Sequence, residues 1–150
     1  MISVSEHIKK SHNVTLLLYH LVCPVKFRKE IFTDEVEKTL KEICLDISQR
    51  YEIIFLEIGT DKDHAHFLLQ SIPDLSVTKI VTMIKSITAK EIFKKHPEVK
   101  KFLWGVSLWT RGYYANTVGK YGSEEAVRKY IKGQGKDYRS IYSNQLTLFE

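Results

Sequence analysis

The stretch YEIIFLEIGTDKDHAHFLLQS, residues 51–71, contains two groups of strand-forming residues around a polar turn. Residues 51–59 and 64–71 are rich in aliphatic and aromatic side chains, and TDKD, residues 60–63, is typical of a turn. The pattern predicts an antiparallel hairpin with a short loop. Every other predicted element can be placed relative to this hairpin.

Alternation along residues 64–71 divides the second hairpin strand into two faces. Ala65, Phe67 and Leu69 share an apolar face, which we expect to pack against helices. The opposite face carries His64, His66, Leu68 and Gln70. Residues two apart in a strand are roughly 6.6 Å apart, so both imidazoles can reach one metal ion. The two histidines are therefore candidate metal ligands.

The segments around the hairpin complete an α+β pattern. The sequence predicts a strand at 14–22, a helix at 33–50, the hairpin strands at 51–59 and 64–71, a helix at 76–96, a strand at 105–119 and a helix at 123–134. This order predicts a ferredoxin-like βαββαβ antiparallel sheet with an added C-terminal helix.

The length of the chain and its hydrophobic runs indicate a single-domain protein without a membrane span. A chain of 150 residues fits one domain, which we expect to have its core at about 13–138 and a short tail. The longest hydrophobic run, residues 14–25, is shorter than the roughly 20 residues of a membrane span. No secretory signal is visible, and the 2 cysteines form no disulfide framework. We therefore expect a cytoplasmic location and no membrane partner.

The charge is unevenly distributed along the chain. The net charge is +5, and the Lys and Arg excess lies in residues 76–150. A basic surface favours a polyanionic partner because it releases counterions from phosphates, although a solvated surface explains the charge equally well. The candidate phosphate contacts are Lys85, Lys90, Arg111, Lys120, Arg128 and Lys132. The candidates for stacking on unpaired bases are Trp104, Trp109 and Tyr114.

A pair of histidines alone does not define a metal site, because HxH in a strand is commonly two half-exposed polar residues. Asp63 precedes the pair but points to the other face in a regular strand. Tyr130 and Gln134 lie at i and i+4 of the predicted last helix, so they share one helix face. A glutamine oxygen can bind a divalent ion, and a neighbouring tyrosine can act as a nucleophile.

Three motifs together resemble one protein family. They are HAH in a strand, GYYANTVG in the later strand, and YIKGQ in the last helix. This combination resembles the TnpA-type single-tyrosine transposases of insertion sequences, members of the HUH endonuclease superfamily. The resemblance runs from about Asn13 to Tyr138. In that family a His-hydrophobic-His motif is followed by a helix with a tyrosine and, four residues later, a glutamine.

The resemblance implies a transposase that cleaves and rejoins single-stranded DNA through a covalent 5′-phosphotyrosine. Tyr130 would be the nucleophile, and His64, His66 and Gln134 would hold Mg²⁺ or Mn²⁺. The family also implies hairpin recognition at the element ends and a homodimer in which the tyrosine helix can complete the partner's site. Three alternatives stay open: a domesticated relative, a non-catalytic ferredoxin-like nucleic-acid-binding module, and a metal-dependent phosphodiesterase that activates water.

Overall fold

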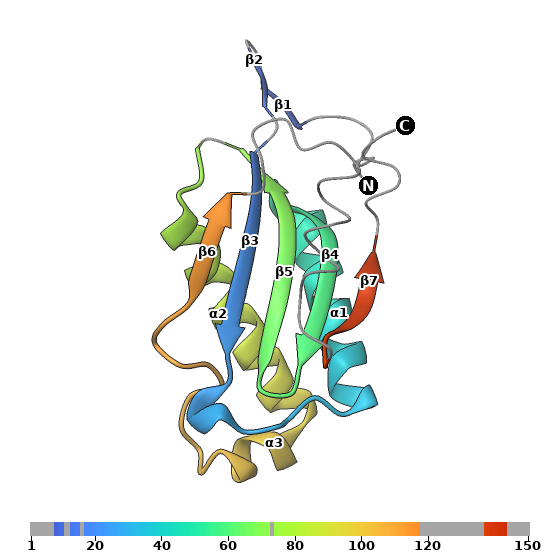
Figure 1. The fold of residues 1–150 in the computed structure, drawn as a ribbon, viewed down its shortest axis with the longest axis vertical. Helices are drawn as coiled ribbons and strands as arrows, with labels where there is room; N and C mark the ends of the chain where they lie inside the picture. The colour runs from blue at the N-terminus through green and yellow to red at the C-terminus, as the bar shows by residue number, and fades with distance from the viewer. Residues whose placement is uncertain (1–7, 11–12, 16, 73, 118–136, 144–150) are drawn as a thin grey trace.

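The computed structural model describes residues 8–10, 13–15, 17–72, 74–117 and 137–143 (Figure 1). The elements are β1 (Ile8–Lys10), β2 (Asn13–Thr15), β3 (Leu17–Pro24), the 3-10 helix η1 (Lys26–Arg28), α1 (Asp34–Arg50), β4 (Ile54–Asp61), β5 (His64–Ser71), α2 (Val77–Lys95), α3 (Pro97–Phe102), β6 (Tyr114–Thr117) and β7 (Arg139–Ser143). The helix expected at 123–134 lies outside the described residues. The proposed extent of the single domain stays a prediction.

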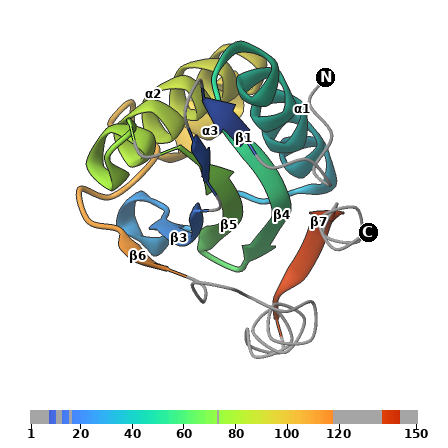
Figure 2. The same cartoon turned by 90° about the horizontal axis from the view of Figure 1, so that it is seen from above.

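The main sheet has five antiparallel strands in the order β6-β3-β5-β4-β7. Strands β1 and β2 pair with each other in a separate two-stranded sheet. Figure 2 shows α1, α2 and α3 on one face of the main sheet. The strands β3, β4, β5 and β6, together with α1 and α2, form the predicted βαββαβ core. The ferredoxin-like α+β prediction is therefore confirmed.

Both long helices begin at the residues that the sequence favours. The Thr33 hydroxyl oxygen accepts a hydrogen bond from the Val36 N–H at 3.2 Å, and the Ser76 hydroxyl oxygen accepts one from Lys79 N–H at 3.1 Å. These contacts satisfy N–H groups that the first turn of a helix leaves unpaired. Pro97 ends α2 as expected, but it also begins α3, because proline suits the first turn of a helix.

Two strand predictions need correction. Of the described part of the strand expected at 105–119, residues 105–117, only Tyr114–Thr117 form a strand, and upstream of it Trp109 makes an isolated bridge to Val25. The ammonium group of Lys85 donates to the carbonyl oxygens of residues 110–112, so that stretch forms a loop bound to α2. The second correction is β7, which was not predicted and pairs with β4.

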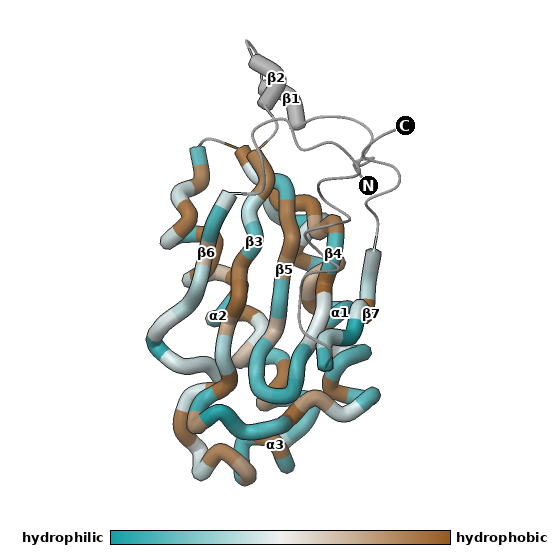
Figure 3. The backbone as a smooth tube through the Cα atoms, in the orientation of Figure 1, coloured by the Kyte–Doolittle hydropathy of each residue, from teal (hydrophilic) through white to brown (hydrophobic). Residues whose placement is uncertain are grey.

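The hydrophobic core fills the space between the sheet and the helices. Ala65, Phe67 and Leu69 are fully buried in it, which confirms the face predicted to pack against helices. Apolar residues recur along the tube in β3, β4 and β5 (Figure 3). Cys23 and Cys44 are free thiols inside this core, and burial raises the pKa of both. No helix in the described part of the chain is long and apolar enough to cross a membrane.

Candidate metal centre

The hairpin brings three ligand-type side chains together at one end of the sheet. Strands β4 and β5 are joined by two residues, so Asp61 pairs directly with His64 in the ladder. Directly paired residues share a sheet face, and His66 shares that face because it is two residues further on. One ligand atom from each of Asp61, His64 and His66 lies within 4.8 Å of the other two.

The ring of His64 is oriented by the turn residue before it. Its Nδ1–H donates to Asp63 Oδ1 at 2.7 Å, and Arg28 donates to both oxygens of the same carboxylate at 3.0 and 3.2 Å. Partial burial raises the pKa of Asp63, but the hydrogen bonds from Arg28 and His64 outweigh this and hold the pKa below its usual range. His64 Nε2 lies 3.6 Å from Asp61 Oδ2, on the other side of the ring from Asp63.

His66 is oriented from the other side, by His20 of β3. The two rings join through His66 Nδ1 and His20 Nε2 at 3.2 Å. Burial, with smaller contributions from His64 and His20, lowers the pKa of His66 to about 3, so its imidazole is neutral at neutral pH. In the tautomer that carries the ring proton on Nδ1 and donates it to His20 Nε2, the Nε2 lone pair of His66 faces the site, as a metal ligand requires.

These residues fit a divalent metal ion. His66 Nε2 is buried and has no hydrogen-bond partner, which is costly for a polar atom unless a ligand satisfies it. Two imidazoles and one carboxylate form a donor set that suits several divalent metals. The structure therefore brings His64 and His66 together as predicted. It adds Asp61, whereas Gln134 lies outside the described residues and its role as a ligand stays a prediction.

His20 was not predicted to belong to the site. Sequence spacing offered no signal, because His20 lies 46 residues from His66. The alternation of side chains along the strand that ends at Pro24 assigns His20 to one face of that strand. It places His20 next to His66 only once the β3–β5 register is known. In that register Val22 is opposite His66, and His20 is the diagonal neighbour on the same face.

We expect His20→Leu to weaken Mn²⁺ binding by about 10- to 100-fold, the usual effect of losing an outer hydrogen-bond partner of a metal ligand. His20→Gln is the matched variant, because its amide oxygen can still accept from His66 Nδ1–H. Calorimetric Mn²⁺ titration of both variants measures the effect. Equal losses in both variants would contradict the hydrogen-bonding role.

The C-terminal strand brings Tyr138 over the same face. The Tyr138 ring lies edge-on to His66 with centroids 5.0 Å apart, and its hydroxyl donates to Glu57 Oε2 at 2.7 Å. A Cβ added to Gly59 would overlap the Tyr138 ring, so glycine makes room for it. Burial and the Glu57 carboxylate raise the pKa of Tyr138, which keeps its hydroxyl protonated and makes it a poor nucleophile.

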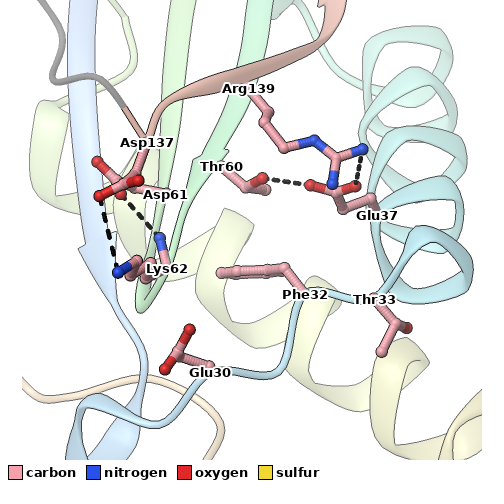
Figure 4. Close-up of a pocket in the computed structure, with 9 residues that line it drawn as sticks. All are labelled: Glu30, Phe32, Thr33, Glu37, Thr60, Asp61, Lys62, Asp137 and Arg139. Carbon is pink, nitrogen blue, oxygen red and sulfur yellow. Dashed lines mark hydrogen bonds and ion pairs between the residues drawn. The ribbon is translucent and has the colours of Figure 1, made fainter.

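A pocket of about 260 Å³ opens beside the metal centre (Figure 4). Its lining residues are Glu30, Phe32, Thr33, Glu37, Thr60, Asp61, Lys62, Asp137 and Arg139. The buried Glu37 carboxylate accepts from the Thr60 hydroxyl and forms an ion pair with Arg139 at 3.3 Å. Asp61 belongs to both the pocket and the metal centre, whereas neither His64 nor His66 lines the pocket.

The predicted DNA contacts fall into several groups. Lys90 and Arg111 are exposed, whereas the Lys85 ammonium has a structural role in binding the 110–112 carbonyls. Trp109 is wrong as a stacking residue, because it is buried and its Nε1–H donates to the Thr88 hydroxyl at 2.9 Å. Trp104 and Tyr114 are exposed. The predicted phosphate contacts Lys120, Arg128 and Lys132 lie outside the described residues, and so does the predicted nucleophile Tyr130.

Comparison with known proteins identifies the family. The IS200-like transposase family profile matches residues 13–134. The ISDra2 transposase TnpA of Deinococcus radiodurans is 32% identical over 118 residues, which cover 79% of this chain and 84% of that protein. The transposase for insertion sequence element IS200 of Salmonella typhimurium is 28% identical over 116 residues, covering 77% and 75% of the two chains.

Two solved structures share the fold. A Deinococcus radiodurans protein assigned as a transposase superposes with a TM-score of 0.68 at 29% identity, over 85% of this chain and 97% of that one. A REP-associated tyrosine transposase bound to a REP hairpin gives a TM-score of 0.53 at 9% identity, over 83% and 67%. The second match shows the fold alone. With the profile covering most of its length, the chain belongs to the IS200-like transposase family.

Proposed function

We propose that this transposase cuts and rejoins single-stranded DNA at the ends of an insertion sequence through a covalent link to Tyr130. The observation that carries the proposal is the convergence of Asp61, His64 and His66, with a buried, unpartnered nitrogen at its centre. That arrangement suits a metal-assisted phosphoryl transfer, and the named relatives are transposases.

The chain's own residues prepare the site for this reaction. Asp63 accepts the Nδ1 proton of His64, and His20 Nε2 would accept that of His66, so both histidines would present their Nε2 atoms to a metal ion. Asp61 adds a carboxylate, and we propose Gln134 as a further ligand. When bound there, Mg²⁺ or Mn²⁺ would polarise the scissile phosphate and stabilise the negative charge that develops on it.

Tyr130 is the proposed nucleophile. Its phenol oxygen would release its proton to water and bond to the scissile phosphorus as the bond from phosphorus to the 3′-oxygen breaks, and the 3′-oxygen would take a proton from water and leave as a 3′-hydroxyl. The 5′-phosphotyrosine bond replaces the phosphodiester bond that was broken, so the bond energy is retained. A 3′-hydroxyl can therefore attack the phosphotyrosine and rejoin the DNA without ATP. An ordinary tyrosine has a pKa of about 10, so attack at neutral pH needs the polarised phosphate.

The position of Tyr138 limits how far Gln134 can lie from the histidines. Tyr138 contacts His66 directly, and Gln134 precedes it by four residues, a length of chain that spans at most about 14 Å. This length keeps Gln134 within reach of the histidines of its own chain, whereas Tyr130, eight residues before Tyr138, can extend up to about 29 Å from it. Tyr138 itself is unsuited to attack, because its hydroxyl donates to Glu57 and its pKa is raised.

The DNA and the second subunit are further parts of the proposal. The REP-associated relative is bound to a DNA hairpin, and this chain has a basic second half suited to phosphates. Within the described sheet β6 is an edge strand with Tyr114 exposed, so a second copy could pair along it. We propose hairpin recognition by a homodimer, with Tyr130 acting in its own subunit or in the partner's.

The test is a covalent-adduct assay. The full chain is incubated with a single-stranded hairpin oligonucleotide and Mg²⁺ or Mn²⁺, then denatured and separated by electrophoresis. We expect a protein–DNA adduct that Tyr130→Phe eliminates and Tyr138→Phe still forms. An adduct that persists in Tyr130→Phe would overturn the nucleophile. Cleavage without an adduct would favour a water-activating phosphodiesterase, and binding without cleavage would favour a non-catalytic module.

A further inference from the structure

Three exposed aromatic side chains gather around a lysine at one end of the molecule. Phe27, Phe102 and Trp104 are 49%, 49% and 67% exposed. The Lys29 ammonium lies 4.3 Å from the Phe102 ring centroid and 4.4 Å from that of Trp104. Phe27 packs edge-on to Trp104 with centroids 5.0 Å apart. These four residues are here named the aromatic–lysine platform.

The platform is continuous with the metal centre. Arg28, between Phe27 and Lys29 in the chain, binds the Asp63 carboxylate that orients His64. The Val25 N–H also donates to the Asp63 carbonyl oxygen at 2.8 Å, which fixes the start of this segment to the β4–β5 turn. Figure 1 shows α3 at the same end of the sheet as that turn. The platform and the metal centre therefore lie at the same end of the sheet and are linked through Arg28 and Asp63.

Backbone conformation sets this region apart. Phe27, Arg28 and Trp104 have φ values of 61°, 53° and 56°, and they are the only non-glycine residues in the described segments with positive φ. Side chains of this size rarely adopt that region because it is sterically strained, and such strain tends to persist at functional sites. Simple core packing does not explain this strain, because Phe27 and Trp104 stay about half exposed or more.

The chemistry of the platform fits one ligand. Exposed aromatic faces stack on unpaired bases of any sequence, and lysines between them neutralise the adjacent phosphates. Lys26 lies 5.6 Å from the Phe27 centroid, and α3 adds Lys100 and Lys101, so basic residues outnumber the acidic neighbours Glu30 and Glu98. This excess of positive charge favours a nucleic acid over an apolar protein surface.

We propose that the aromatic–lysine platform binds unpaired bases of the single-stranded DNA next to the cleavage site, with Trp104 as the principal stacking residue. The proposal rests on the proposed function in one respect, which is that the DNA passes through the metal centre. Base stacking itself requires neither metal nor Tyr130. Binding can therefore be measured in EDTA, where no covalent adduct forms.

Tryptophan fluorescence provides a direct test. The chain has 2 tryptophans, and Trp109 is buried, so Trp109→Phe leaves Trp104 as the sole emitter. We expect an unstructured oligothymidylate to quench this emission in EDTA. Trp104→Ala in the full chain should weaken oligothymidylate binding about tenfold by fluorescence anisotropy, the usual effect of losing one stacked base. Lys29→Gln should reduce the salt dependence of binding by about one phosphate.

Two controls separate stacking from other effects. Tyr51→Ala removes an aromatic side chain that is 39% exposed and has Arg50 5.6 Å from its ring, but lies outside the platform, and it should leave affinity unchanged. An abasic oligonucleotide of equal length keeps the phosphates and should bind wild type and Trp104→Ala equally.

Three results would overturn the platform: no effect of Trp104→Ala, the same loss with the abasic strand, or a loss of self-association instead of DNA binding. Failure of the platform is distinct from failure of the proposed function, because the covalent-adduct assay reports on Tyr130 alone. An adduct formed by a chain whose Trp104→Ala variant binds normally would keep the function and reject the platform. Quenching of Trp104 by the oligonucleotide in a chain that forms no adduct would keep the platform and reject the proposed function.

Discussion

Replacing His66 with alanine should abolish metal-dependent DNA cleavage, with a loss of at least about a hundredfold. The imidazole supplies the buried, unpartnered nitrogen at the centre of the candidate site, and its pKa of about 3 keeps the ring neutral at neutral pH, so one ring nitrogen has a free lone pair. Lewis-acid assistance contributes several kcal/mol to such reactions, and about 1.4 kcal/mol corresponds to a factor of ten in rate. The measurement is the single-turnover cleavage rate as a function of Mn²⁺ concentration.

His96→Ala is the matched control for this experiment. His96 is also partly buried and hydrogen-bonded, with its Nε2 2.7 Å from the Thr39 hydroxyl, but it lies at the junction of α2 and α3. We expect His96→Ala to keep the Mn²⁺ dependence of cleavage and His66→Ala to keep its circular dichroism spectrum. Wild-type cleavage rates in His66→Ala would refute the metal centre. Restoration of its cleavage by high Mn²⁺ would show a weakened rather than absent site.

Gly59→Ala should destabilise the protein by about 1–3 kcal/mol and displace Tyr138 from His66. A Cβ at this position overlaps the Tyr138 ring, and relief requires the ring to leave both His66 and Glu57. Overpacking of a buried contact has costs of this size. The free energy of unfolding in urea measures the loss.

A double-mutant cycle distinguishes this clash from a backbone effect. In a Tyr138→Ala background the added methyl group has space, so Gly59→Ala should cost much less there than in the wild type. Tyr138→Phe keeps the ring and loses only the hydrogen bond to Glu57, so the clash should persist in that background. Equal costs of Gly59→Ala in all three backgrounds would show that the ring is not the cause.

The sequence predicted the local elements well because their signals are local. Alternation in 64–71 placed Phe67 in the core, and Thr33 and Ser76 marked the helix starts. Strand β7 gave no comparable signal, since DYRSIYS is short and polar and becomes a strand only by pairing with β4. The segment before β6 was read as a strand because nothing local shows that Lys85 binds its carbonyl groups.

Only part of the candidate site could be predicted from the sequence. His64 and His66 share a strand face by simple periodicity, so the pair could be found without a structure. Asp61 was missed because TDKD was read as a four-residue turn, whereas the ladder continues to Asp61 and leaves two residues in the turn. His20 and Arg28 come from β3 and η1, and only the folded register brings them to the histidines.

Strand β7 has a consequence for the order of folding. The β4–β5 hairpin closes over two residues, whereas the β4–β7 ladder joins Glu57 to Ser143. Long loops close at a higher entropic cost and form later than local contacts. We expect the histidine hairpin to be complete early, with Tyr138 arriving in one of the last steps. During synthesis the hairpin that carries Asp61, His64 and His66 would therefore form before Tyr138 packs against His66.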